Sequence, residues 1–322
     1  MKLLHSPIKL VSTLMLGAAL VACGGDDDDN SNDQSMMDAD PMTVVDVAVE
    51  NGNFTTLVAT LQATGLDAVL DDPDTNFTVF APTDAAFAAL GDDTINALLA
   101  DTDTLSDILL YHVISGAEVD STAAVAAAGT KVEMANEDSI ALSYVDSVLY
   151  VNTAMVTLVD VEADNGVIHV LDAVITPPAE RTDTTSNIVG TAVAAGNFTT
   201  LVAALQAAGL DTVLADPDRD FTVFAPTDAA FAALPDGTVD ALLADPGGDL
   251  TTILLNHVLA DAEVDSITAM TLNGSSATSA ADQALDIHIE DGNLYIAGAM
   301  VTTADIYTSN GIIHVIDMVI TD

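Results

Sequence analysis

Residues 77–90 of this chain read FTVFAPTDAAFAAL, and the same letters recur without change at residues 221–234. Upstream of these stretches, NFTTLVATLQATGLDAVL begins at Asn53 and a close copy, NFTTLVAALQAAGLDTVL, begins at Asn197. Both matches are offset by 144 residues. Because solenoid repeats are far shorter, on the order of 20–50 residues, this offset indicates a duplicated domain.

Two further blocks extend the repeat towards the end of each copy. YHVISGAEVD from Tyr111 matches NHVLADAEVD from Asn256, and NGVIHVLDAVIT from Asn165 matches NGIIHVIDMVIT from Asn310. The repeat therefore covers nearly all of the chain after its first forty residues.

The repeat and the composition between its copies set the domain boundaries. We predict one domain at residues 41–176 and a second at residues 186–322. Between them, residues 177–185 read PPAERTDTT, whose prolines and polar side chains indicate a short linker.

Within each copy the apolar spacing changes from that of helices to that of strands. Residues 54–61 and 105–112 repeat apolar side chains at helical spacing. Residues 77–80 are typical of a buried strand, and Thr83 can cap a short helix after it. After about Gly129 come short segments rich in Val, Ile, Thr and Tyr, separated by turn residues. Helices followed by an antiparallel sheet predict an α+β fold.

The three ordered blocks TVFAPTDAAFAAL, (Y/N)HV(I/L) and NG(V/I)IHV(L/I)D resemble the fasciclin domain, and both copies carry all three. The resemblance implies two tandem fasciclin-like domains, each a β-sandwich-like wedge with helices packed at one side. It also implies a role in cell adhesion or in extracellular matrix or biofilm interaction, by binding and without catalysis.

The first residues are typical of an export signal. Lys2 and Lys9 precede an apolar run at residues 10–22, too short for the roughly 20 residues of a membrane-spanning helix. The run ends at Cys23 in LVAC, which resembles a bacterial lipobox. We expect a signal peptide at 1–22, a lipid on Cys23 and an acidic flexible linker at 23–40. The protein is then exported and held at the cell envelope, at the outer membrane or cell surface, touching the membrane only through its lipid.

The resemblance nominates two sets of candidate adhesion residues. The first is a Tyr-His pair, which falls on Tyr111 and His112 but on Asn256 and His257 in the second copy. Helical spacing places both histidines against the core and Tyr111 on another face, so Tyr111 is the better candidate for direct contact. Histidines 169 and 314, in apolar strands, are expected in the core.

The second set is an Asp-Ile pair, which falls on Asp305 and Ile306 and only on Asp160-Val161 in the first copy. Its alternative interpretation is an ordinary strand residue beside a solvated aspartate.

The charge is extreme, with 5 Lys+Arg against 50 Asp+Glu and a net charge of -45. Nucleic acid is therefore excluded as a partner. The acidic side chains are dispersed along the chain, which is typical of a protein that works in salty water. The alternative is that acidic clusters such as residues 71–74 and 216–220 bind Ca²⁺ weakly and non-specifically. No other cofactor or metal is expected.

No nucleophile-elbow, zinc-protease, dinucleotide-binding or P-loop motif occurs, so the chain is not expected to be an enzyme. The expected partner is a cell-surface or matrix protein or a polysaccharide. Two alternatives stay open: a small-molecule carrier or enzyme with a site between the domains, and an acidic structural spacer.

Overall fold

The computed structural model describes residues 41–181 and 185–321. The expected signal peptide, Cys23 and the acidic linker lie outside these residues. In the part of the chain that is described, no helix is long and apolar enough to cross a bilayer.

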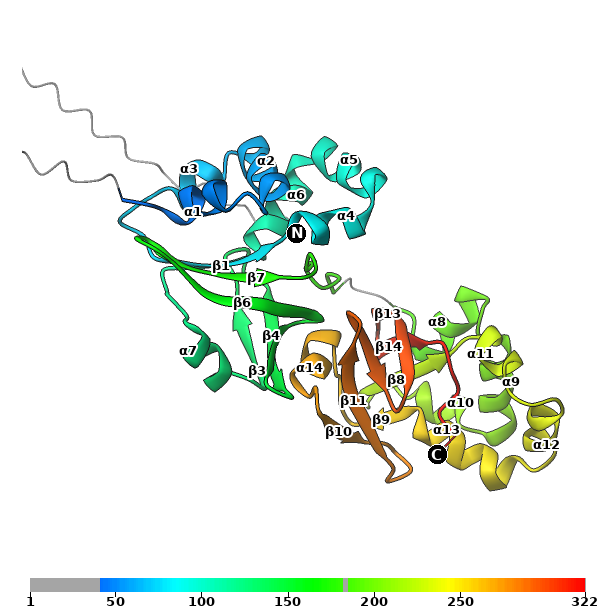
Figure 1. Ribbon diagram of the computed structural model, residues 1–322. Helices are drawn as coiled ribbons and strands as arrows, with labels where there is room; N and C mark the ends of the chain where they lie inside the picture. The colour runs from blue at the N-terminus through cyan, green and yellow to red at the C-terminus, as the bar shows by residue number, and fades with distance from the viewer. Residues whose placement is uncertain (1–40, 182–184, 322) are drawn as a thin grey trace, which may run out of the picture. The chain divides into compact units, whose positions relative to one another are not determined.

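In the first domain, helices precede β1, lie between β1 and β2 and lie between β2 and β3, and the remaining strands follow one another (Figure 1). Its elements are α1 (Val44–Asn51), α2 (Thr55–Thr64), α3 (Asp67–Leu70), β1 (Phe77–Pro82), α4 (Asp84–Leu90), α5 (Asp92–Ala100), α6 (Thr102–Leu110), β2 (Val113–Ser115), α7 (Ser121–Ala126), β3 (Thr130–Glu133), β4 (Ser139–Val145), β5 (Val148–Val151), β6 (Ala154–Ala163) and β7 (Gly166–Leu171).

The second domain repeats this order, except that an irregular helical turn followed by α13 takes the place of α6. Its elements are α8 (Ile188–Ala195), α9 (Thr199–Ala208), α10 (Asp211–Leu214), β8 (Phe221–Pro226), α11 (Asp228–Ala232), α12 (Thr238–Ala244), the turn at Pro246–Leu250, α13 (Thr251–Asn256), β9 (Val258–Ala260), α14 (Ser266–Thr271), β10 (Ser275–Thr278), β11 (Ala284–Glu290), β12 (Asn293–Ile296), β13 (Ala299–Thr308) and β14 (Gly311–Ile316).

Each domain has one seven-stranded sheet, in the order β2-β1-β7-β6-β5-β4-β3 and its counterpart in the second domain. The α+β class is confirmed. The expectation of an antiparallel sheet is wrong in one pair, because β1 runs parallel to β7, and β8 to β14. Parallel neighbours need a long crossover, and here the helices and the remaining strands supply it.

Apolar side chains form two cores in the first domain. One lies between the helices and the β1–β7 pair and includes Leu57 of α2, Leu105 of α6 and Ile168 of β7. The other joins Phe80 of β1 to Leu142 of β4, so the two halves of the sheet pack on each other as a sandwich-like wedge. Helices α1 to α6 gather at one side of β1 and β7 in Figure 1, as expected.

Residues 77–90, whose sequence is identical in the two repeats, fix the first turns of two helices. Thr83 accepts a hydrogen bond from the Ala86 amide and caps α4, as predicted. Asp84 reaches instead to the uncapped first turn of α2, where its carboxylate accepts from the amides of Thr55 and Thr56 at 3.2 and 2.7 Å. One short segment therefore fixes the N-termini of two helices.

The Asn-Gly pair before the last strand has a comparable role. Asn165 is buried; its Oδ1 accepts from the Val44 amide at 2.7 Å, and its Nδ2 donates to the carbonyl of Leu70 at 2.8 Å. At Gly166, a Cβ would lie 2.0 Å from the carbonyl oxygen of Phe77. Only glycine lets β7 approach β1 this closely, and Asn310-Gly311 repeats the arrangement.

Candidate interaction surface

Tyr111 is fully buried, with 0% of its surface exposed, so the expectation that it faces solvent is wrong. Helix α6 ends at Leu110 and the chain turns into β2, which directs the ring into the core between the halves of the sheet. Its hydroxyl donates to the Ser139 carbonyl at 2.8 Å and accepts from Asn152 Nδ2 at 2.9 Å. Burial raises the pKa of this phenol well above its usual value. In this fold Tyr111 has no surface for a partner.

His112 and His257 are buried, as helical spacing predicted. In each, Nδ1 donates to the carbonyl four residues earlier, that of Ile108 or Ile253, at 2.8 and 2.7 Å. The Nε2 atoms accept from the amides of Ile175 and Ile320 at 3.2 and 2.9 Å. Burial lowers the pKa of both imidazoles to about 4. The hydrogen-bonded carbonyl favours the charged form and opposes this shift, but its effect is smaller. Each neutral histidine joins a helix end to the last segment of its domain.

The second domain lacks both the tyrosine and the asparagine that donates a hydrogen bond to its hydroxyl. Asn256 takes the place of Tyr111 and is buried, with its Oδ1 accepting from the Ser279 hydroxyl at 3.3 Å. Ala297 stands where the first domain has Asn152. Loss of the tyrosine thus accompanies loss of its hydrogen-bond partner, which is the pattern of a structural pair.

Asp160 and Asp305 lie at matching bulges, where each adopts a left-handed conformation with φ of 56° and 57°. Each carboxylate accepts from the amide of the first residue of a short helix, Ser121 or Ser266, at 2.7 Å, and from its hydroxyl. Asp160 is exposed, but Asp305 is buried and Ile306 is half-buried. The expectation that Asp305 is available for direct contact is wrong, and so is the alternative of a solvated side chain.

The strand histidines support these bulges. Nδ1 of His169 and of His314 accepts from the amides of Asp160 and Asp305 at 3.4 and 3.3 Å. Their Nε2 atoms donate to backbone carbonyls of Val119 and Val264 at 2.8 Å. The prediction that both are hydrogen-bonded core residues is confirmed.

Residues 41–322 form one compact unit, in which Asp305 lies near the contact between the two domains. Helix α14 of the second domain packs against β3 and β4 of the first. Lys131 Nζ donates to both carboxylate oxygens of Asp265, at 3.0 and 2.9 Å. Buried Asn273 donates to the Ser143 hydroxyl at 3.0 Å.

A cavity of about 240 Å³ lies at this contact, between Pro177 and Pro178 on one side and Ile267 and Asp305 on the other. Its single carboxylate, on Asp305, is already bonded to Ser266. The volume is below the roughly 300–1,000 Å³ of usual small-molecule sites. The cavity therefore gives the carrier or enzyme alternative no support.

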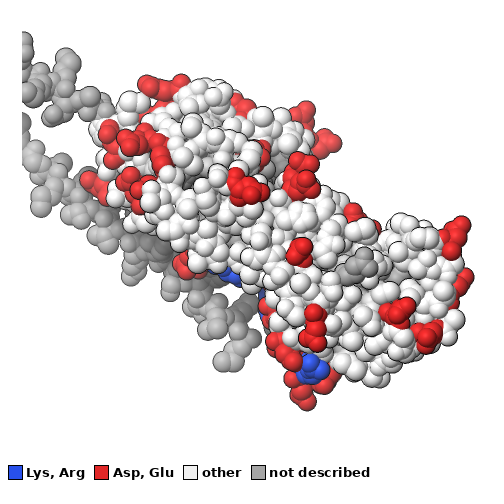
Figure 2. All heavy atoms as spheres, turned by 60° about the horizontal axis from the view of Figure 1, so that its bottom comes forward, with Lys and Arg blue, Asp and Glu red and all other residues white. Residues whose placement is uncertain are grey.

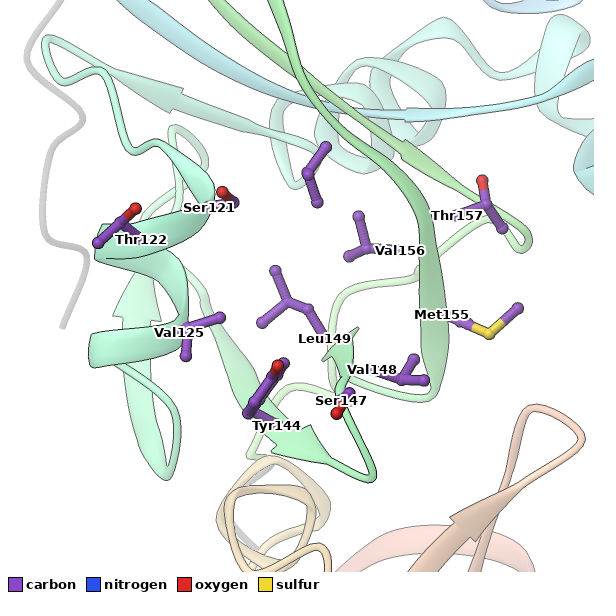
Figure 3. Close-up of a pocket in the computed structure, with 11 residues that line it drawn as sticks. Ser121, Thr122, Val125, Tyr144, Ser147, Val148, Leu149, Met155, Val156 and Thr157 are labelled. Carbon is purple, nitrogen blue, oxygen red and sulfur yellow. The ribbon is translucent and has the colours of Figure 1, made fainter.

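A larger groove, of about 610 Å³, opens on the first domain between α7 and strands β4 to β6. Figure 3 shows Val125, Leu149 and Val156 pointing into it from α7, β5 and β6. Its lining has apolar, hydroxyl and thioether side chains and no charged one. Tyr144 and Val159 at its rim are 45% and 37% exposed, and neighbouring Leu158 is 52% exposed. This is an apolar patch on an otherwise acidic surface.

Acidic side chains are scattered over the face seen in Figure 2, with few basic ones among them. In the described ranges, each basic side chain is already paired: Lys131 with Asp265, Arg181 with Glu263 and Arg219 with Asp261. Asp72 and Asp216, from the acidic clusters, accept from backbone amides two residues ahead. No group of three or more metal-binding side chains occurs among the described residues.

The groove was missed because sequence reasoning looked for polar motifs. Its one signal is a difference between the repeats: the first has Leu158-Val159 where the second has Thr303-Ala304. Two large apolar residues beside a strand bulge, replaced by small or polar ones in the other copy, indicate a surface with a role in one domain alone.

Comparison with known proteins gives the family and the relatives. The Fasciclin domain model matches residues 52–177 and 196–322. The uncharacterized protein sll1735 of Synechocystis is 41% identical over 132 residues, which cover 41% of this chain and 96% of that protein. The cell surface glycolipoprotein MPB83 of Mycobacterium bovis is 38% identical over 104 residues, covering 32% of this chain and 45% of MPB83.

One solved structure spans both domains. It is a FAS1 domain pair from the insect cell adhesion molecule Fasciclin I, with 22% identity and a TM-score of 0.39. The alignment covers 85% of this chain and 98% of that chain.

Proposed function

Because this chain belongs to the fasciclin domain family, with a match in each of its two domains, we propose that it is an adhesion protein of the cell envelope. It acts by binding a cell-surface or matrix protein or a polysaccharide, and it catalyses no reaction. The observation that carries the proposal is the uncharged groove on the first domain, bordered by exposed Tyr144 and Val159, with exposed Leu158 next to Val159 in the chain. Exposed apolar patches with a polar surround are typical of binding sites.

Attachment to the envelope is through a lipid on Cys23. The support is the short apolar run ending at that cysteine, and the name of one relative, a cell surface glycolipoprotein. Two or more acyl chains make anchoring stable, so no further membrane contact is needed. The acidic linker at 23–40 holds the domains away from the bilayer, at the outer membrane or cell surface.

The residues that the family resemblance nominated serve the fold in this proposal. Tyr111, His112, Asn256 and His257 have their polar atoms bonded to neighbouring groups of the same domain. Asp305 holds the start of α14. Direct contact with a partner is left to side chains around the groove.

The proposal is tested by the attachment of cells, with and without this gene, to surfaces and to one another across a titration of Ca²⁺ and NaCl. Loss of attachment on deletion, reproduced by Cys23→Ala and restored by the wild-type gene, is the expected result. Unchanged attachment of the deletion strain would overturn the adhesion role. A salt effect without a specific Ca²⁺ effect would assign the acidic surface to solvation alone.

A further inference from the structure

The same face of the fold is covered in the second domain and exposed in the first. In the first, this face consists of α7 with the β6 bulge, here called the α7 face; in the second it is α14 with the β13 bulge. Thr122 is exposed, whereas its counterpart Ile267 is only 4% exposed. Val159 is exposed, whereas its counterpart Ala304 is half-buried. The difference arises because the first domain covers α14 and nothing in residues 41–181 or 185–321 covers the α7 face.

In the second domain, where this face is covered, the contacts show which kinds of groups bind to it. An amine, that of Lys131, donates to the carboxylate of Asp265. Beside it the contact is apolar and close, since a Cβ at Gly274 would lie 2.9 Å from a methyl group of Val145. The face is thus occupied by a cation and by apolar atoms together.

The α7 face of the first domain, which is uncovered, has an aspartate at the same position for binding a cation. Asp120 is the counterpart of Asp265, and both cap their helices in the same way, by accepting from the amides of Ala123 and Thr268 at 2.7 and 2.6 Å. Asp120 is exposed and has no basic partner among the hydrogen bonds of the described residues. Asp146 and Asp160, also exposed, adjoin the groove lining.

We propose that the α7 face of the first domain docks a segment of a partner protein in which apolar side chains are flanked by Lys or Arg. The apolar side chains enter the groove beside Leu158 and Val159, and the cations meet Asp120 and the neighbouring aspartates. This inference rests on the proposed function as a binding protein and specifies the partner's chemistry.

A second copy of this chain fits the face less well. To cover α7 as the first domain covers α14, the second domain of another copy would present Ser276 in place of Lys131 and Glu290 in place of Val145. Glu290 would bring a further negative charge towards Asp120. The basic side chains of the described residues are engaged in ion pairs of their own. The cation therefore comes from a different protein.

The test measures binding of labelled peptides to the purified full chain by fluorescence anisotropy, at an ionic strength of about 0.15 M. The probe is Lys-Leu-Val-Leu-Lys. Two control peptides separate its features: Lys-Ser-Gly-Ser-Lys keeps the charge alone, and Glu-Leu-Val-Leu-Glu keeps the apolar side chains alone. We expect the probe to bind at least about ten-fold more tightly than either control.

Three variants assign the binding to the α7 face. Leu158→Thr with Val159→Ala gives the first domain the residues of the second, and should weaken probe binding about ten-fold. Asp120→Asn should weaken it about three-fold or more while keeping the helix cap, because asparagine caps as well as aspartate. Val49→Thr, at an exposed valine of α1, is the matched control and should change nothing.

Equal binding of the probe and Lys-Ser-Gly-Ser-Lys would overturn the proposal in favour of non-specific charge attraction. Full binding by the double variant would also overturn it. Sedimentation showing a dimer that the double variant abolishes would assign the face to a second copy instead. These results do not depend on cell attachment, so failure of the adhesion role and failure of this inference are distinguishable.

Discussion

At the scale of single residues, the side chains that look most reactive serve the fold. Tyr111 and the paired histidines are buried, and hydrogen bonds satisfy their polar atoms. Helical spacing was enough to predict the buried histidines, because both follow directly on apolar helices. It failed for Tyr111, because the periodicity identifies only the helix face that packs on the first core, whereas Tyr111 enters the second core, between the halves of the sheet.

Replacing Tyr111 with phenylalanine keeps the ring and removes the hydroxyl. The Ser139 carbonyl and the Asn152 amide then lose a partner inside the protein, so Tyr111→Phe should reduce the free energy of unfolding of the first domain by about 1–3 kcal/mol. Urea denaturation checks this. Tyr144→Phe, at an exposed tyrosine, is the control. Equal stability of the wild type and Tyr111→Phe would contradict a structural role.

The buried histidines predict a pH dependence of stability. Each has a folded-state pKa of about 4, below its ordinary value of 6.5. Between these values the unfolded chain binds protons that the folded chain does not, so stability is fully present above pH 6.5 and is lost as pH falls towards 4. The loss should approach about 3 kcal/mol per histidine. Urea denaturation at several pH values measures it, and a flat profile between pH 6.5 and 4 would refute the assignment.

At the scale of elements, the blocks repeated in sequence are those that fix helix starts and strand contacts. Thr83 and Asp84 cap two helices, and Asn165-Gly166 joins α1, α3 and β1 to the last strand. Sequence alone predicted helices α2, α4 and α6 of the first domain, the cap of α4 and the α+β class. It did not predict the parallel β1–β7 pair, because side-chain alternation identifies a strand without identifying its neighbour.

Gly166→Ala tests the close approach of β7 to β1. A Cβ placed 2.0 Å from the Phe77 carbonyl oxygen forces the backbone apart, and should cost more than about 3 kcal/mol of unfolding free energy. Gly52→Ala is the matched control, since Gly52 also has a positive φ, of 75°, but no atom within 4 Å of its would-be Cβ. Its expected cost is about 1 kcal/mol. Similar costs for the two variants would remove the steric explanation.

At the scale of the whole molecule, two copies of one fold have become unequal. The face that the first domain covers on the second is open on the first, where larger apolar residues stand at its rim. The sequence recorded the difference as Leu158-Val159 against Thr303-Ala304. Which face is covered depends on how α14 packs against β3 and β4, and no local pattern predicts such a contact.

In our proposal, adhesion acts through the open face of the first domain. Its most direct test is the attachment of cells that display equal amounts of the wild-type protein, the Leu158→Thr, Val159→Ala double variant and the Val49→Thr control. We expect attachment by the wild type and the control, and attachment by the double variant close to that of the deletion strain. Full attachment by the double variant, beside loss on deletion, would contradict the claim.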